Sequence, residues 1–219
     1  IIPQNLKKLE KKQNEINALL NKLSPKNYDS IEGKILLFFS EKDEEINIES
    51  LINYIIDSIF LKAVMQPIYR PYYVKLLKKM TELFENTIEL INKRCVEFKT
   101  IIKTSSDTTI TEIQPNELSD TSTNIVEKSE AEKKTEKEKY DLFCKANKEK
   151  RFKEGYSQFV GELYNKQMIT IETLEDNISH FVHTLELESQ IDCKHTNVED
   201  LLICISKLIT TVVNRQNKT

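Results

Sequence analysis

Apolar residues recur at steps of three and four along most of the chain, a spacing that places them on one face of an α-helix. This periodicity predicts roughly seven main helices. Their apolar stripes lie within residues 28–38, 48–63, 72–84, 88–102, 152–163, 171–185 and 201–212. A shorter or frayed helix is expected nearer the N-terminus, with its apolar positions at Leu6, Leu9, Ile16 and Leu19.

Several helix ends are marked by capping residues and prolines. Ser24 followed by Pro25 predicts that the first main helix begins there, because serine caps a helix and proline fits its first turn. Pro67 ends the second main helix, and Pro71 begins the third. A capping-box pattern at residues 196–199 begins the last helix.

The helical pattern stops between residues 103 and 139, where Ser, Thr, Glu and Lys dominate. Such a composition buries too little apolar surface to offset chain entropy, so a disordered insertion is predicted. The chain is therefore divided into an N-terminal segment (1–23), two helix pairs (24–102), the insertion (103–139), and a third pair with the start of a fourth (140–219).

The composition supports an all-α fold. Three glycines and five prolines in 219 residues are too few for the turns of a β-sandwich or a doubly wound α/β fold. Helices of about 15 residues with short connections favour an α-solenoid of antiparallel pairs, although periodicity alone does not separate a solenoid from a bundle. Gly161 lies within a predicted helix, where it indicates close helix approach, and Glu162 is expected to bond a neighbouring helix end.

Charge, hydropathy and cysteine spacing restrict the class of protein. The net charge of −3 lacks the overall basic character of a strong nucleic-acid binder, although a local basic face is compatible with it. No apolar stretch approaches the ~20 residues that span a bilayer, and no signal-peptide pattern is present. The four cysteines show no C-x-x-C spacing, as expected for reduced thiols. A cytoplasmic protein without a membrane partner is predicted.

No catalytic or metal-binding motif is found in the sequence. A phosphate-binding G-x-x-x-x-G-K loop, a nucleophile elbow and a zincin motif are all absent. His180 and His183, and Cys193 near His195, do not make a four-ligand zinc set. We therefore predict a protein that is not an enzyme and that has no cofactor and no metal site.

Three segments resemble the middle domain of eukaryotic translation initiation factor 4G, in that family's order. The first is Leu-Asn-Lys-Leu-Ser-Pro at 20–25 with Tyr28 after it; the second is Ile-Asp-Ser-Ile-Phe-Leu-Lys-Ala at 56–63, continuing through Pro67 to Tyr72. The third is Gln-Phe-Val-Gly-Glu-Leu-Tyr at 158–164, followed by Met-Ile-Thr. Weaker similarities lie at 92–98 and 208–211, so the resemblance spans about residues 20–213.

This resemblance implies a HEAT-type crescent that lacks the family's C-terminal repeats. It implies a translation initiation scaffold that binds and activates a DEAD-box RNA helicase of the factor 4A type and helps to recruit mRNA to the ribosome. The mRNA and other initiation factors are further candidate partners. The helicase-binding positions implied by the family's motifs are Leu20, Lys22, Leu23, Tyr28 and Phe60.

The same residues have plainer interpretations. Leu20, Leu23 and Tyr28 either contact a partner or close the end of the helical array, and Phe60 lies on a regular apolar stripe that favours core packing. Tyr69, Arg70 and Lys75 are candidate RNA-binding residues, since tyrosine rings stack on bases.

Two other functions are compatible with the sequence. A related HEAT scaffold would hold a different DEAD-box protein in RNA decay or splicing. A mainly RNA-binding HEAT array would keep the packing motifs without a helicase partner.

Overall fold

A computed structural model describes residues 4–40, 47–100, 130–191 and 196–214. All regular structure in these ranges is α-helical, which confirms the predicted all-α class. The eight helices there are α1 (Gln4–Asn21), α2 (Tyr28–Ser40), α3 (Ile48–Met65), α4 (Arg70–Leu83), α5 (Thr87–Lys99), α6 (Glu130–Asn165), α7 (Ile171–Ile191) and α8 (Thr196–Val213). None of these helices is long and apolar enough to cross a membrane.

Side-chain caps begin α3 and α7, whereas α4 and α5 start without one. The side-chain oxygen of Asn47 accepts a hydrogen bond from Ser50 N at 3.2 Å, which caps α3. As predicted, α3 ends before Pro67, and α4 has proline in its first turn. Thr170 Oγ1 accepts from Thr173 N at 3.2 Å and caps α7 in the same way.

The predicted start of α2 at Ser24 is wrong. The helix begins at Tyr28, and residues 22–27 form a turn instead. The reason is a local alternative to helix: Asn27 N donates to Ser24 O at 3.2 Å, and Ser24 N donates to the Asn27 side chain at 2.7 Å. These bonds close the turn before the helix can start.

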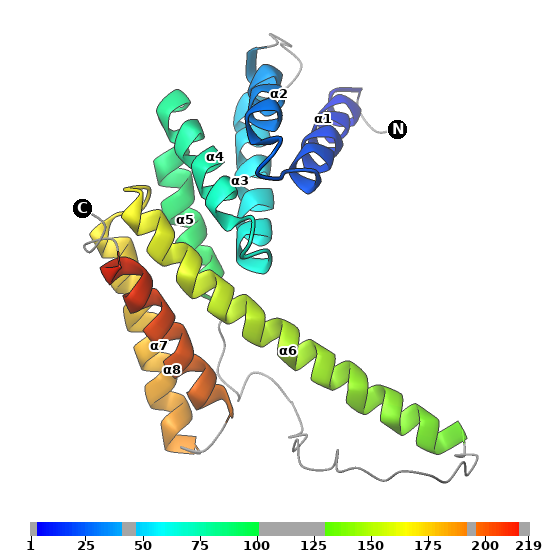
Figure 1. Ribbon diagram of the computed structural model, residues 1–219, viewed down its shortest axis with the longest axis vertical. Helices are drawn as coiled ribbons and strands as arrows, with labels where there is room; N and C mark the ends of the chain where they lie inside the picture. Colours follow the sequence, from blue (N-terminus) through cyan, green and yellow to red (C-terminus); the bar gives the residue numbers. More distant parts are fainter. Residues whose placement is uncertain (1–3, 41–46, 101–129, 192–195, 215–219) are drawn as a thin grey trace.

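The helices pack in two rows (Figure 1). The first row contains α1, α3, α5 and α7, and each helix in it packs against the next. The second row contains α4, α6 and α8, while α2 packs against α1. Contacts of α3 with α4 and α6, and of α7 with α8, join the rows. The apolar side chains between them form a continuous core that runs from Ile16 on α1 to Leu208 on α8.

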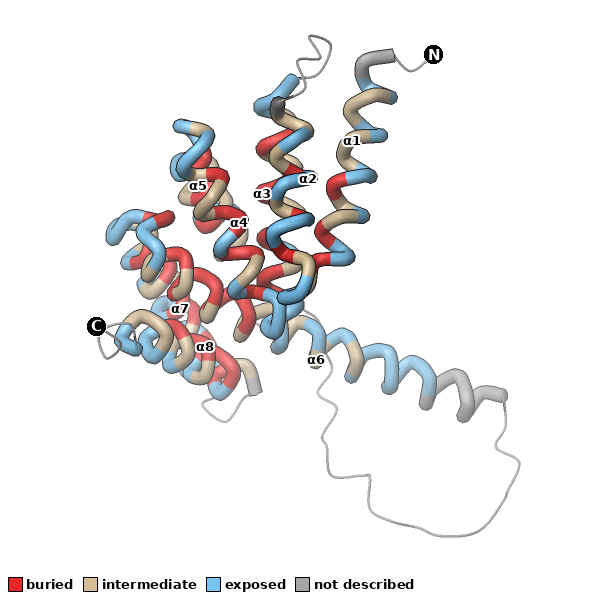
Figure 2. The backbone as a smooth tube through the Cα atoms, turned by 45° about the horizontal axis from the view of Figure 1, so that its top comes forward, coloured by how far each residue is buried: buried red, intermediate tan, exposed pale blue. Residues whose placement is uncertain are grey.

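Helix α6 begins earlier than the sequence boundary at 139 predicts. Residues 130–139 are helical, whereas residues 103–129 lie outside the described part of the chain. Ala, Glu and Lys have high intrinsic helix propensity, so this charged stretch continues the helix without an apolar face of its own. Figure 2 shows the described part of this half of α6 as mostly exposed, projecting from the packed rows.

Two glycines on α6 allow close contact with neighbouring helices. A Cβ at Gly155 would lie 2.1 Å from Val64 O on α3. A Cβ at Gly161 would lie 2.9 Å from the Cβ of Thr211 on α8, which confirms that close approach is the reason for this glycine. Both distances are shorter than ordinary van der Waals contact, so α6 holds its position because these residues lack side chains.

Candidate partner-binding site

The turn between α1 and α2 is held by one asparagine. Besides its bond with Ser24, the Asn27 side chain donates to Lys22 O at 2.7 Å. One amide group therefore bonds both ends of the turn. Its role was missed from the sequence, although an asparagine directly before a helix is a recognised signal for such a turn.

The apolar residues of the first motif are buried. Leu20 is fully buried, and Leu23 and Tyr28 are only 4% and 3% exposed. They therefore do not form an exposed patch in the unbound chain. Leu20 O lies 3.4 Å from the Tyr73 hydroxyl and the Tyr28 ring lies against Tyr72, so the turn packs on α4 and these residues belong to the core of the unbound chain.

Tyr28 is packed among charged and aromatic neighbours. Its ring lies 5.9 Å from that of Tyr72, and Lys75 Nζ lies 3.9 Å from the Tyr28 ring centroid, in a cation–π arrangement. Burial raises the pKa of the Tyr28 hydroxyl, and the carboxylates of Glu32 and Asp29 raise it further. Tyr28 therefore stays neutral and connects α2 to α4.

Phe60 is the centre of an aromatic cluster. It is fully buried, its ring lies 5.0 Å from that of Phe159 in an edge-to-face arrangement, and it lies 5.3 Å from that of Phe98. Phe60 belongs to the second motif and Phe159 to the third. The family motifs therefore meet inside the core, and a partner cannot reach Phe60 without unpacking them.

Arg70 is buried, with 3% exposure, and its guanidinium bonds groups of α3 and α6. Its Nε donates to Ala63 O at 2.9 Å, and its Nη1 donates to Gln158 Oε1 at 2.9 Å and lies 3.5 Å from Glu162 Oε1. Glu162 thus pairs with the start of α4, as expected for a residue that bonds a helix end. Arg70 is not available to bind RNA, since its charge is already used between α3, α4 and α6.

The other two candidate RNA-binding residues are exposed but face different neighbours. Lys75 extends toward α2, where its Nζ lies 3.5 Å from Asp29 as well as over the Tyr28 ring. Tyr69 precedes α4 and is 36% exposed. With Arg70 buried between them, these residues do not make one continuous RNA-binding surface.

The second motif is also tied to the weaker similarity at 92–98. Arg94 pairs with Asp57, Nη2 to Oδ2 at 3.2 Å, and with Glu97 on its own helix. Burial raises the pKa of Asp57 above its usual value, although Arg94 opposes this shift. The ion pair fixes α5 against α3.

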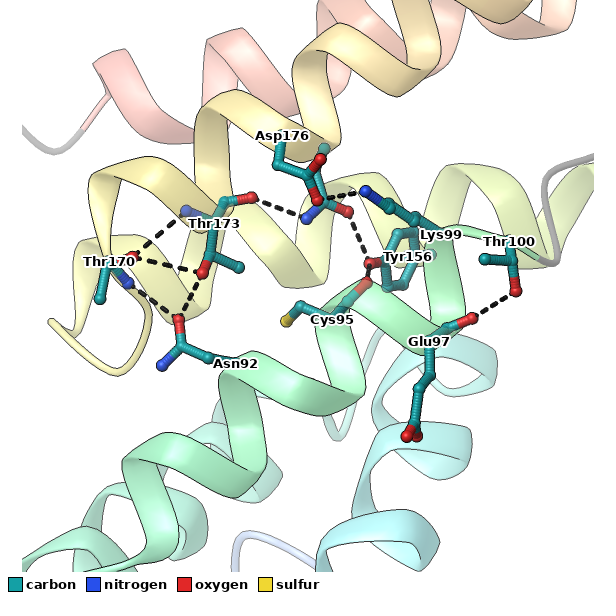
Figure 3. Close-up of polar contacts among 10 residues, drawn as sticks. Asn92, Cys95, Glu97, Lys99, Thr100, Tyr156, Thr170, Thr173 and Asp176 are labelled. Carbon is teal, nitrogen blue, oxygen red and sulfur yellow. Dashed lines mark hydrogen bonds and ion pairs between the residues drawn. The ribbon is translucent and has the colours of Figure 1, made fainter.

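A polar network joins α5, α6 and α7 on the side of the core that Figure 3 shows. Asn92 Oδ1 accepts from Thr170 N at 3.1 Å and from Thr173 Oγ1 at 2.6 Å. The Tyr156 hydroxyl lies 2.7 Å from Cys95 O and 2.6 Å from Asn177 Oδ1. Because these groups bond across α5, α6 and α7, the network stabilises the packing of the three helices.

The exposed surface next to the first two motifs is formed by the turns that flank them. Tyr73 O–H lies 2.9 Å from Gln66 Oε1 and 3.4 Å from Leu20 O, and Lys62 Nζ donates to Asn21 Oδ1. The α1–α2 and α3–α4 turns are therefore neighbours. Their outward side chains, Lys22, Met65, Ile68 and Tyr69, are called the turn edge below.

The turn edge presents apolar side chains to solvent. Ile68 is 79% exposed and Met65 is 46% exposed. Met65 ends α3 and Ile68 lies in the turn that follows, so both exposed apolar side chains belong to one short segment. Only Lys22 among the predicted helicase-binding residues lies on this surface, and Met65 and Ile68 were missed because the helical stripes do not include them.

Metal-ligating side chains do not gather anywhere in the described ranges. His183 is exposed and lies 4.0 Å from Glu186, and the backbone oxygen of His180 accepts from Thr184. Cys193 and His195 lie outside the described residues. Cys95, Cys144 and Cys204 are free thiols, and burial raises the pKa of Cys204 to about 11.

Replacing Asn27 by Ala is expected to lower the free energy of unfolding by about 1–2 kcal/mol, because two backbone groups of the turn lose their partner. The free energy of unfolding of Asn27→Asp should lie between those of Asn27→Ala and the native chain, because the aspartate keeps only the acceptor for Ser24 N. Urea denaturation measures both. Asn53→Ala is the control, because Asn53 bonds only Glu49 O of its own helix. Equal midpoints for Asn27→Ala and the native chain would contradict this role.

Comparisons of the chain with protein-family models, curated proteins and solved structures found no match.

Proposed function

We propose that the chain is a HEAT-type scaffold for a DEAD-box RNA helicase of the factor 4A type, acting in cytoplasmic translation initiation. One observation carries the proposal: the three segments that resemble the family contact one another between the helices. Tyr28 packs on Tyr72, Phe60 packs on Phe159, and Arg70 bonds Gln158. Segments separated by up to 88 residues thus keep mutual contacts.

The packing of alternate helices supports the HEAT-type part of the proposal. In an array of helix pairs, each helix lies beside the corresponding helix of the next pair. The row of α1, α3, α5 and α7 has this relation, and so has the row of α4, α6 and α8.

The turn edge is the surface that we assign to the helicase. The motif residues beneath it are buried and shape the two turns, while Ile68 and Tyr69 extend outward. A few desolvated anchors carry most of the energy of an interface, and exposed aliphatic and tyrosine side chains are suited to that role. The scaffold would contribute no catalytic group and would act by holding the helicase lobes.

The test uses the double variant Ile68→Asp with Tyr69→Ser. Purified native chain is expected to bind a factor 4A helicase and to raise its RNA-dependent ATPase rate. The variant should bind at least about tenfold more weakly, because both anchors of the turn edge are removed. Its melting temperature should be nearly native, since substitutions at exposed sites change stability little.

The control is Ile191→Asp with Lys139→Glu, which changes one exposed aliphatic residue and one exposed lysine on α7 and the projecting half of α6. It should bind the helicase normally. Native binding by the turn-edge variant would refute the site. A native chain that leaves factor 4A unbound but captures a DEAD-box protein of RNA decay or splicing, or only RNA, would refute the function.

A further inference from the structure

A groove lies between α1 and α2, and among the residues that line it only Lys22 belongs to the turn edge. Its volume is about 670 Å³. Its lining contains five lysines, one glutamate and three large apolar side chains: Lys8, Lys11, Lys12, Lys22, Lys34, Glu15, Leu19, Leu37 and Phe38, with Ala18 between them. This balance is opposite to that of the whole chain, whose net charge is −3.

The spacing of the α1 residues makes the groove a continuous strip. Lys8, Lys12, Glu15 and Leu19 follow one another at steps of four, three and four, so they share one face of α1, and Lys22 extends the strip just beyond the end of the helix. Fourteen residues of rise correspond to about 21 Å of groove length. This length matches a helix of about four turns laid along it.

The second wall of the groove is apolar and open to solvent. Leu37 on α2 is 60% exposed, with the half-buried Phe38 next to it and Leu19 opposite on α1. Lys34 lies one turn before Leu37 and is exposed. The groove therefore combines aliphatic surface along its length with cationic groups on both sides.

We propose that this groove binds an acidic amphipathic helix of a partner protein. The aliphatic stripe of such a helix would cover Leu19, Leu37 and Phe38, and its carboxylates would face the lysines on α1 and Lys34 on α2. This is the helix-in-groove mode of recognition, in which apolar anchors repeat every three or four residues and charge sets the orientation. The inference is additional to the helicase contact, because the groove and the turn edge share only Lys22.

Charge alone would also attract RNA, but the groove surface favours a peptide. Sequence-tolerant binding of single-stranded RNA uses aromatic faces on which bases stack. Phe38 is the single aromatic residue among those that line the groove, and it is half-buried. Leu19 and Leu37 offer aliphatic contacts, which bury well against leucine or isoleucine and poorly against phosphate and ribose.

The test titrates the full chain with a fluorescent peptide of about 14 residues, the length that the groove spans. Leucines at helical spacing and Glu or Asp elsewhere give the peptide an apolar stripe and a negative charge. A scrambled peptide of the same composition lacks the stripe, and a uridine oligonucleotide of equal charge represents RNA. The groove variant is Lys34→Glu with Leu37→Asp. Lys22 is left unchanged because it also belongs to the turn edge.

Native chain is expected to bind the amphipathic peptide at least about tenfold more tightly than the scrambled one, and the groove variant should lose at least about tenfold in affinity. The control Ile191→Asp with Lys139→Glu should bind normally. Circular dichroism checks that both variants stay folded. No binding of the amphipathic peptide, equal binding of the scrambled peptide, or unchanged affinity in the groove variant would overturn the proposal.

Tighter binding of the oligonucleotide, lost in the same groove variant, would overturn it in favour of an RNA site. The outcome is independent of the helicase test. The groove variant keeps Ile68 and Tyr69, so it should still stimulate the helicase, and the turn-edge variant should still bind the peptide.

Discussion

Gly155→Ala is expected to lower the free energy of unfolding by about 3 kcal/mol, near the upper end of the cost of overpacking a core. The added Cβ would lie 2.1 Å from Val64 O and 3.0 Å from Val64 C, both atoms of the α3 backbone. A backbone group cannot rotate away as a side chain can. The two helices must therefore separate along their contact, which outweighs the gain of about 1 kcal/mol in helix propensity.

The other two glycines of the chain provide matched comparisons. Gly161→Ala meets the side chain of Thr211 at 2.9 Å, and a smaller loss of about 1 kcal/mol is expected because that side chain can shift. Gly33→Ala meets nothing within 4 Å and lies within α2, so a gain of about 0.5–1 kcal/mol is expected. Chemical denaturation of the three variants measures the order of their free energies of unfolding. A Gly155 variant as stable as the Gly33 variant would contradict the α3–α6 contact.

Helical periodicity predicted the elements that pack a regular apolar stripe. The stops and starts at Pro67 and Pro71 were correct, because proline restricts the backbone locally and no distant contact can reverse that restriction. The predicted start of α2 was wrong, because the competing turn depends on the side chain of Asn27 and not on the expected cap at Ser24. The early start of α6 was not predicted, because residues with high helix propensity but no apolar face leave no apolar stripe in the sequence.

Burial of the first motif could have been predicted from the stripe itself. Ile16, Leu20 and Leu23 follow at steps of four and three, and all three are buried. The predicted stripe at Leu6, Leu9, Ile16 and Leu19 was therefore wrong by one position at its end, where Leu20 is the buried residue. The turn edge could not be predicted, because exposure of Ile68 depends on where α1 and α3 end in space.

The motifs that resemble the initiation factor family are mostly packing residues. Phe60 with Phe159, Asp57 with Arg94, and Arg70 with Gln158 each join two helices across the core. Such pairs preserve the relative placement of helices, and the exposed residues of a binding surface vary more freely. A change of the exposed residues of the turn edge therefore tests partner binding without disturbing these packing pairs.

The second large effect is expected at Arg70. Arg70→Met should lower the free energy of unfolding by about 3 kcal/mol, the lower end for a broken buried ion pair, because Glu162 is 30% exposed and keeps Lys166 nearby. Ala63 O, Gln158 Oε1 and Glu162 all lose a donor. The control is Lys79→Met, which breaks the exposed pair with Glu82 and should change stability by no more than about 0.5 kcal/mol.

A double-mutant cycle with Glu162→Gln separates the charge from the packing of the Arg70 stem. The double variant should recover much of the loss, because the neutral amide costs less to bury than a carboxylate without its cation. If Arg70→Met and the double variant are equally unstable, the loss comes from the stem and from the bonds to Ala63 and Gln158. That result would contradict the role assigned to the ion pair.

The pH dependence of the stability lost in Arg70→Met is an independent test of the Arg70–Glu162 ion pair. Burial raises the pKa of Glu162 above its usual value even in the native protein, with Arg70 and Lys166 opposing the shift. Without Arg70 the pKa must rise further, so the folded variant binds a proton more readily than the unfolded chain does. A carboxyl whose pKa is higher in the folded state than in the unfolded state lowers the free energy of unfolding at high pH. This loss of stability is complete above the folded-state pKa and disappears as the pH falls to the unfolded-state pKa. The stability difference between native chain and Arg70→Met should therefore narrow from about pH 7.5 to about pH 5. A difference that stays constant over this range would show that Glu162 is not the group left uncompensated.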